Sequence, residues 1–231
     1  MLIGGLQPVT LLDYPQKVAA IIFTVGCNMR CPFCYNPSLV LSSQIEKVKT
    51  IKEIDIINFL KKRLKYLDGV VITGGEPTLQ SDLFSFCQKL KKIGYLVKLD
   101  TNGLRPEVLK KILDNKLIDY IAMDIKGSEE NYNQAAGVKI DFNNIKKSIA
   151  LILGSGLPHE FRSTLVRGLH SSADVVKMSQ LVSGADKYFL QGFRKNRNLV
   201  DPYFSGRNFS SKIMNEFKDS ASAYVEACET R

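Results

Sequence analysis

Short apolar segments alternate with longer amphipathic ones along most of the chain. The short segments are rich in Val, Ile, Phe and Tyr, as β-strands are, and most of them lack regular polar alternation. They span Val18–Thr24, Val70–Thr73, Leu96–Thr101, Tyr120–Ile125, Glu160–Leu165 and Lys187–Gln191. Continuous apolar runs of this length are typical of strands buried on both faces of a parallel sheet.

Amphipathic segments fill the gaps between these apolar runs. In the first gap, apolar residues recur at spacings of three and four from Ile54 to Leu64, which predicts a helix over Ile51–Leu67 with Thr50 as its N-cap. Further helices are expected over Ser81–Ile93, Pro106–Leu113, Phe142–Leu153 and Asp174–Leu181, and a last helix at about 211–227. The chain is therefore predicted to consist of successive strand–helix units.

Six strand–helix units in sequence predict an α/β fold with a parallel sheet and right-handed crossovers. A complete barrel of this type has eight units, so we expect a partial, TIM-like (βα)6 barrel with an open side. No internal repeat or long linker divides the chain, and residues 1–231 are expected to form a single domain. Ligands bind at the carboxyl ends of parallel strands, so polar residues there are the candidates for chemistry.

The composition is that of a globular protein. Apolar residues make up 45% of the chain and charged residues 24%, which excludes intrinsic disorder. Lys and Arg outnumber Asp and Glu by 32 to 23, and the net charge of +9 favours acidic partners or ligands. No apolar segment approaches the roughly 20 residues that cross a bilayer, so we expect a cytoplasmic protein that does not bind membranes.

Three of the five cysteines lie in one short segment, 26–37, directly after the first predicted strand. Cys27, Cys31 and Cys34 form a C-x3-C-x2-C pattern, a spacing typical of thiolates that hold an iron–sulfur cluster. Three ligands on a four-iron cluster leave one iron open to a substrate. A structural zinc site would need a fourth ligand, and a redox C-x-x-C pair would leave Cys27 unexplained. The other two cysteines, Cys87 and Cys228, lie on predicted helices, where core packing is the simpler explanation for Cys87.

The second strand runs into Thr73-Gly74-Gly75-Glu76-Pro77. Two glycines let a ligand approach the backbone closely, and Glu76 adds a carboxylate. A plain turn would also use Gly-Gly and Pro, so this segment alone leaves both interpretations open.

The third and fourth strands end in further charged residues. The third ends in Asp100-Thr101-Asn102, which would also serve as a helix-capping turn before Pro106. On the fourth strand, alternation places Asp124 and Lys126 on one face. Such a pair suits the ammonium and carboxylate of an amino acid, and the alternative is an ordinary surface ion pair.

The cysteine pattern, with an aromatic residue before its third Cys, resembles the radical S-adenosylmethionine superfamily. The wider opening of the chain resembles one branch of it, through Ile3-Gly4-Gly5-Leu6-Gln7, Leu12-Asp13-Tyr14-Pro15 and Cys34-Tyr35-Asn36-Pro37. That branch contains the activating proteins of anaerobic ribonucleoside-triphosphate reductase, which are relatives of the pyruvate formate-lyase activating enzyme. The resemblance covers essentially the whole chain.

The resemblance implies two cofactors, a [4Fe-4S] cluster on Cys27, Cys31 and Cys34 and S-adenosyl-L-methionine on its open iron. It places the GGEP segment at the methionine amino group, and Asp100 and Thr101 near the methionine end with a monovalent cation. Gln191 and Tyr35 stand where pyruvate formate-lyase activators carry His. The implied cofactor-binding residues are Phe33, Tyr35, Gly74, Gly75, Glu76, Asp100, Thr101, Asn102, Asp124, Lys126, Arg162 and Gln191.

By the same resemblance, the chain is an oxidoreductase that cleaves S-adenosylmethionine reductively. The 5′-deoxyadenosyl radical then takes a hydrogen atom from a glycine of a glycyl-radical enzyme, with anaerobic ribonucleotide reductase as the expected partner. Reduced flavodoxin or ferredoxin is the expected electron donor. No catalytic side chain is expected beyond the cluster and its bound S-adenosylmethionine. The polar, glycine-bounded segment Gly127–Gly137 is expected to touch the partner, unless it is an ordinary loop.

Four alternatives remain open for the function. The substrate of the same chemistry could be another glycyl-radical enzyme or a small molecule. It could also be tRNA, which the basic clusters Lys61–Arg63, Lys89–Lys92 and Arg194–Arg197 would contact, although no RNA-binding motif accompanies them. A non-catalytic iron–sulfur module is the last alternative, and the intact cysteines, GGEP and D-x-K segments argue against it.

Overall fold

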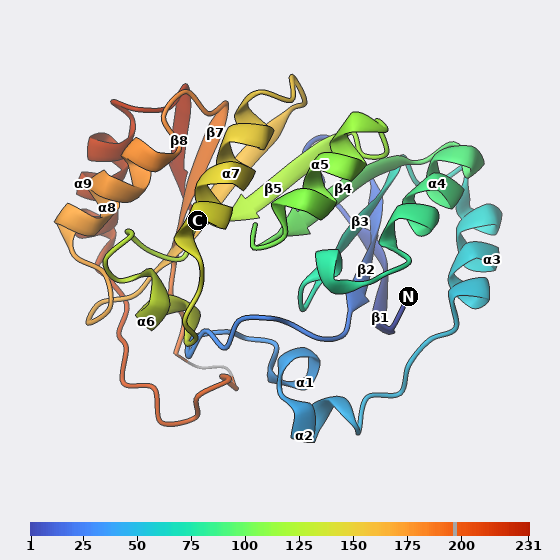
Figure 1. The fold of residues 1–231 in the computed structure, drawn as a ribbon, viewed down its shortest axis with the longest axis horizontal. Helices are drawn as coiled ribbons and strands as arrows, with labels where there is room; N and C mark the ends of the chain where they lie inside the picture. Colours follow the sequence, from blue (N-terminus) through green and yellow to red (C-terminus); the bar gives the residue numbers. More distant parts are fainter. Residues whose placement is uncertain (196–197) are drawn as a thin grey trace. The chain divides into compact units, whose positions relative to one another are not determined.

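The computed structural model of the chain describes residues 1–195 and 198–231 and shows two compact units (Figure 1). The first consists of Met1–Asn28, Ser38–Thr101 and Glu107–Ile121. The second consists of Met29–Pro37, Asn102–Pro106 and Ala122–Arg231. The cysteine segment is therefore divided, with Cys27 in the first unit and the other two motif cysteines in the second.

The strands of the first unit follow one another in chain order. They are β1 (Ile3–Thr10), β2 (Ala19–Thr24), β3 (Gly69–Gly74) and β4 (Leu96–Thr101). β2, β3 and β4 are parallel, as expected, and β1 runs antiparallel to β2. β1 was not predicted, because its middle residues are half-buried or exposed and Gly, Gln and Pro interrupt its apolar positions.

The helical elements of this part of the chain are α1 (Pro37–Val40), α2 (Ser42–Ile45), α3 (Glu53–Arg63), η1 (Pro77–Leu79), α4 (Leu83–Ile93) and α5 (Pro106–Asp114). The expected bounds of α3 were wrong at both ends: Lys52, not Thr50, is the N-cap, and Leu64 is the C-cap. Ile54 is 58% exposed, because it lies two residues, about 200°, around the helix from buried Ile56.

The second unit repeats the parallel pattern. β5 (Tyr120–Asp124), whose first two residues belong to the first unit, is followed by β6 (His159–Leu165), β7 (Lys187–Gly192) and β8 (Ala227–Thr230). β6, β7 and β8 are parallel neighbours. The helices are α6 (Tyr132–Ala136), α7 (Phe142–Leu153), α8 (Ser172–Leu181) and α9 (Ser211–Ala221), and α8 and α9 pack side by side (Figure 1).

The end of the chain differs from its prediction. The last helix was expected to reach residue 227, but α9 ends at Ala221 and β8 follows, so Cys228 lies on a strand and not on a helix. Tertiary hydrogen bonds stop the helix: the Gly184 N–H donates to the Tyr224 carbonyl, and the Glu226 N–H donates to the Ala185 carbonyl. The sequence of β8 is Ala-Cys-Glu-Thr, and its residues are exposed or half-buried, so no apolar run marks it as a strand.

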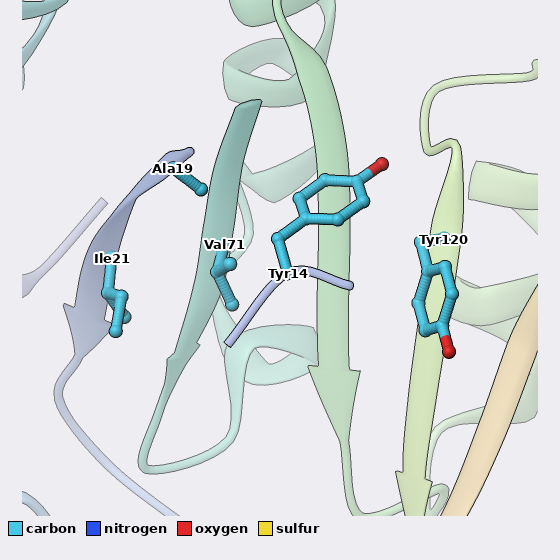
Figure 2. Close-up of a cluster of buried hydrophobic side chains, with 5 residues drawn as sticks. All are labelled: Tyr14, Ala19, Ile21, Val71 and Tyr120. Atoms are coloured by element: carbon cyan, nitrogen blue, oxygen red, sulfur yellow. The ribbon is translucent and has the colours of Figure 1, made fainter. Parts of the chain in front are cut away.

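An apolar cluster lies at the amino ends of the first unit's strands (Figure 2). Tyr14, Ala19, Ile21, Val71 and Tyr120 form it, and the rings of Tyr14 and Tyr120 are 5.8 Å apart. Ala19 and Tyr120 are the first residues of β2 and β5. Ile21 and Val71 extend the cluster to the middle of β2 and β3, and the polar residues Glu76 and Asp100 lie at or just beyond the carboxyl ends of β3 and β4, where the site was expected.

None of the described helices is long and apolar enough to cross a membrane.

Candidate functional site

The end of β3 touches the backbone that leads into Cys27. The Gly75 N–H donates to the Thr24 carbonyl (2.9 Å) and the Glu76 N–H donates to the Gly26 carbonyl (2.8 Å). A Cβ on Gly75 would lie 2.0 Å from the Gly26 oxygen, so no larger residue fits. Gly74 adopts φ +116°, a conformation that favours glycine. Within this unit, the two glycines thus allow the close approach of the Thr24–Gly26 backbone. The sequence had suggested the close approach of a ligand instead.

The carboxylate of Glu76 is fixed in place by hydroxyl and backbone donors. Its Oε1 accepts from the Thr78 N–H (3.1 Å), from the Thr78 hydroxyl and from the Thr101 hydroxyl (2.7 Å). Glu76 is 1% exposed and also caps η1. The GGEP segment is therefore a turn and a carboxylate site at once, and β4 helps to orient the carboxylate through Thr101.

Asp100 forms a buried ion pair that sequence reasoning missed. Lys98 Nζ lies 2.8 Å from Asp100 Oδ1, and Lys98 is 1% exposed. Lys98 and Asp100 occupy alternate positions of β4, so they share a face. A lysine in the middle of an apolar strand, two residues before an aspartate, was the available signal.

The second unit holds the other two motif cysteines in a tight turn, where the Cys34 N–H donates to the Cys31 carbonyl (3.0 Å). Cys31 is buried and Cys34 is half-buried. Neighbouring segments fix this turn, because the Val200 N–H donates to the Cys34 carbonyl (3.0 Å) and the Arg30 N–H donates to the Ala136 carbonyl (2.7 Å).

The two aromatic residues beside Cys34 are engaged with other side chains. Phe33 is 3% exposed and packs against Phe204 and His170, with ring centroids 6.2 and 6.4 Å away. Tyr35 stacks on Phe193, and its hydroxyl accepts from the Arg194 N–H (2.6 Å). These contacts give Phe33 and Tyr35 a structural role, while their contact with a cofactor stays a prediction.

One ionic cluster joins the end of β5 to the middle of β6, and it consists of Asp124, Lys126 and Arg162. Lys126 Nζ contacts one carboxylate oxygen of Asp124 and Arg162 Nε the other, each at 2.9 Å. Burial alone would raise the pKa of Asp124, but Arg162 and Lys126 outweigh it and hold that pKa well below its ordinary value. Burial alone would lower the pKa of Lys126, and Asp124 and the Cys31 thiolate raise it instead. The predicted juxtaposition of Asp124 and Lys126 is thus present, and Arg162 completes it.

His170 fixes the backbone beside this cluster, a role that no sequence signal indicated. Its Nδ1 accepts from the Val166 N–H (3.0 Å), so Nε2 carries the hydrogen and donates to the Lys126 carbonyl (2.8 Å). Burial lowers the pKa of His170, which favours this neutral form. The histidine therefore joins the segment after β6 to the segment after β5.

Asn102 and Gln191 have local polar contacts. Asn102 Oδ1 accepts from the Leu104 N–H (3.1 Å), so the turn expected before Pro106 is present. Gln191 lies within 3.5 Å of the Thr164 hydroxyl, on the neighbouring strand. Their contact with a cofactor stays a prediction.

The two cysteines outside the motif are poor metal ligands. Burial raises the pKa of Cys87 to about 12 and that of Cys228 to about 11, and a metal binds the thiolate. All five cysteines are free of disulfides. The motif cysteines are thus the available thiolates, and their donor chemistry fits an iron–sulfur cluster. Within the described ranges no three Cys, His, Asp or Glu side chains are gathered as a metal site, so this ligand set stays a proposal.

Two expected surface features change in the structure. Segment 127–137 is not an open loop: it contains α6, and Tyr132, Ala135 and Ala136 are buried. Among the basic clusters, Lys89 pairs with Glu53 and Lys91 with Asp119, each at 2.6 Å. Arg197 lies outside the described residues.

Comparison with known proteins identifies the class. The model of the Radical SAM superfamily matches residues 21–177, and the chain belongs to that superfamily. It is 36% identical over 198 residues to the "Putative glycyl-radical enzyme activating enzyme MJ1227" of Methanocaldococcus jannaschii, covering 83% of this chain and 80% of the relative. It is 30% identical over 206 residues to the pyruvate formate-lyase-activating enzyme of Streptococcus mutans, covering 79% and 76%.

Among solved structures, the chain is similar to Streptococcus suis SuiB bound to S-adenosylmethionine, with a TM-score of 0.69 and 13% identity. The likeness covers 91% of this chain, which spans about half (51%) of the SuiB chain. At this identity it shows the fold, and the predicted α/β partial barrel is confirmed. The chain is therefore a radical S-adenosylmethionine enzyme, homologous to glycyl-radical enzyme activating enzymes, and its family uses a [4Fe-4S] cluster and S-adenosylmethionine.

Proposed function

We propose that this chain generates a glycyl radical on a partner enzyme, and that the partner is anaerobic ribonucleoside-triphosphate reductase. The observation that carries the activase role is the homology to two activating enzymes over about four-fifths of the chain. The choice of reductase among glycyl-radical enzymes rests on the opening segments Ile3–Gln7 and Leu12–Pro15, which resemble that branch of activators.

Cys27, Cys31 and Cys34 would hold the cluster. Bound there, the cluster would supply the one-electron reduction of S-adenosylmethionine and so the radical chemistry that removes a glycine hydrogen. The chain's own contribution is to position these groups. Gly26, at φ +97°, directs the backbone into Cys27, and the Cys31–Cys34 turn is held by the backbone of Val200.

The charged residues at the strand ends would bind the amino-acid part of S-adenosylmethionine. Glu76 would accept a hydrogen bond from its ammonium group, because three donors already hold that carboxylate in one orientation. Lys126 would donate to its carboxylate. An ammonium has three N–H donors, and the contact with Asp124 uses one of them. Arg162 would add positive charge from β6, although Glu160 lies 3.7 Å from its guanidinium.

An acidic one-electron carrier, reduced flavodoxin or ferredoxin, would supply the electron. The net charge of +9 supports this choice, because opposite charges speed the encounter of two redox proteins. We expect the rate of reduction to fall steeply as ionic strength rises.

The test is low-temperature electron paramagnetic resonance on an anaerobic mixture of reconstituted protein, dithionite, S-adenosylmethionine and the host's anaerobic ribonucleotide reductase. We expect a glycyl doublet that is absent without S-adenosylmethionine and absent with Cys27→Ala. Cys228→Ser, a change at a cysteine outside the motif, is the matched control and should keep the doublet.

The products separate the two parts of the proposal. If 5′-deoxyadenosine forms without a doublet, the cofactor chemistry stands and the reductase is the wrong partner, so other glycyl-radical enzymes come next. If neither forms in protein with a full cluster, the activase proposal is wrong.

A further inference from the structure

The carboxylates expected to hold a monovalent cation already have cationic partners. The family resemblance implied a monovalent cation near Asp100 and Thr101, and Asp124 is a further carboxylate among the expected cofactor-binding residues. In the first unit, the Lys98 ammonium lies 2.8 Å from Asp100. In the second unit, Lys126 and Arg162 each lie 2.9 Å from Asp124. The donor set at these carboxylates therefore does not fit an added monovalent cation.

Lys98 lies on the face of β4 that continues from the apolar cluster. Leu96, two residues earlier, packs against that cluster, and Asp100 follows two residues later. The Lys98 ammonium is 5.7 Å from the ring centroid of Tyr120, a favourable cation–π distance. The ring of Tyr120 and the carboxylate of Asp100 thus hold the Lys98 ammonium near the carboxyl end of β4.

Because both side chains are buried, the charge of Asp100 depends on the Lys98 ammonium for its compensation. Lys98 is 1% exposed and Asp100 8% exposed, so water contributes little to the solvation of either charge. A buried carboxylate needs a compensating positive charge, which a monovalent cation or a side chain can supply. Here the side chain is covalently part of the strand and cannot diffuse away.

We propose that the ammonium group of Lys98 takes the place of a monovalent cation at Asp100, so that this chain binds S-adenosylmethionine without Na⁺ or K⁺. The inference uses the cofactor of the family and is independent of the partner proposed above. It assigns Lys98 as a positioning residue that acts through Asp100.

The wild-type holoenzyme gives the first test. Its dissociation constant for S-adenosylmethionine is measured by equilibrium dialysis in sodium, potassium and choline chloride at equal ionic strength. We expect the three values to agree within about twofold, which is less than 0.5 kcal/mol. Binding that weakens about tenfold in choline would overturn the proposal.

Lys98→Met gives the second test, because it removes the ammonium group that contacts Asp100. We expect affinity to fall about tenfold or more in choline and to recover partly in Na⁺ or K⁺. The double variant Lys98→Met/Asp100→Asn removes both charges and should show no such recovery. Lys91→Met, which breaks the half-exposed pair with Asp119 in the same unit, is the matched control and should behave as wild type.

Sodium NMR tests the proposal independently of where S-adenosylmethionine binds, because it detects a bound cation directly. Wild-type protein should leave the sodium line width unchanged, and Lys98→Met should broaden it. Broadening by the wild type that Asp100→Asn abolishes would show a cation at Asp100 and overturn the proposal, whether or not S-adenosylmethionine binds. Should Lys98→Met fail to fold, the wild-type measurements alone still separate the two outcomes.

Discussion

Gly75→Ala is a demanding test of how the GGEP turn is built. The added Cβ would lie 2.0 Å from the Gly26 carbonyl oxygen and 2.7 Å from the Gly26 carbonyl carbon. Both are backbone atoms, so no side-chain rotation relieves the clash. An acceptable carbon–oxygen contact of about 3.3 Å requires the two segments to separate by about 1.3 Å.

That separation removes two hydrogen bonds. The Glu76 N–H to Gly26 carbonyl bond, now 2.8 Å, would exceed hydrogen-bond length, and the Gly75 N–H to Thr24 carbonyl bond would distort with it. Each contributes about 1 kcal/mol net, and residual strain adds to the loss. We therefore expect the free energy of unfolding to fall by about 2–4 kcal/mol. Because Gly26 precedes Cys27, iron content after reconstitution should fall as well.

Urea denaturation followed by circular dichroism measures the stability, and iron and sulfide analysis measures the cluster. Gly5→Ala is the matched control in the same unit, because its Cβ would meet the nearest side-chain atom at 3.4 Å, an ordinary contact. Its stability should change by less than about 1 kcal/mol. If Gly75→Ala keeps both wild-type stability and a full cluster, the close approach of the two segments is not required and the reasoning fails.

Three further outcomes concern the second unit. Asp124→Asn removes the carboxylate that Lys126 and Arg162 contact. We expect the free energy of unfolding, measured by urea denaturation, to fall by about 2 kcal/mol. This value allows for the partial exposure of the Asp124 side chain. The folded-state pKa of Asp124 is depressed, so its stabilisation is full above an unfolded-state pKa of about 4 and is lost as pH falls through the folded-state pKa. A parallel acid titration should show this loss in the wild type and not in Asp124→Asn. The pKa of His170 is also depressed, so the stabilisation that His170 contributes declines as pH falls below about 6.5. In His170→Gln, the thermal unfolding temperature should therefore depend less on pH between about pH 5 and 7 than in the wild type. An unchanged slope in that variant would mean that folding does not lower the pKa of His170.

Much of the strand and helix order could be predicted, because strands buried on both faces are continuous apolar runs in the sequence. β4 has the expected bounds Leu96–Thr101, and α7 the expected bounds Phe142–Leu153. The errors fall where tertiary contacts decide. β8 has four residues and exists through pairing with β7, and α9 stops where the backbone of the following segment bonds to residues 184 and 185. No local pattern contains that information.

The candidate site divides in the same way. Charge at the end of an apolar strand is unusual and visible, and it identified Glu76 and Asp124 as candidates, whereas Arg162 was expected from the family resemblance. Strand alternation correctly placed Asp124 beside Lys126, but sequence did not reveal the pairing of Asp124 with Arg162 or of Asp100 with Lys98. Asp100 was expected to need an added cation, and the structure supplies Lys98 instead. No sequence pattern marked His170, because its two hydrogen bonds join it to Val166, 4 residues away, and to Lys126, 44 residues away.

The charged groups assigned to the amino-acid part of S-adenosylmethionine share one property: each is held by the protein's own donors. Glu76 is bound by two threonines, Asp100 by Lys98, and Asp124 by Lys126 and Arg162. Side chains ordered in advance lose little entropy when a ligand arrives, so more of the contact energy remains for binding. The side-chain ammonium on β4 extends this arrangement, because it makes charge compensation at Asp100 a property of the sequence and not of the salt in the medium.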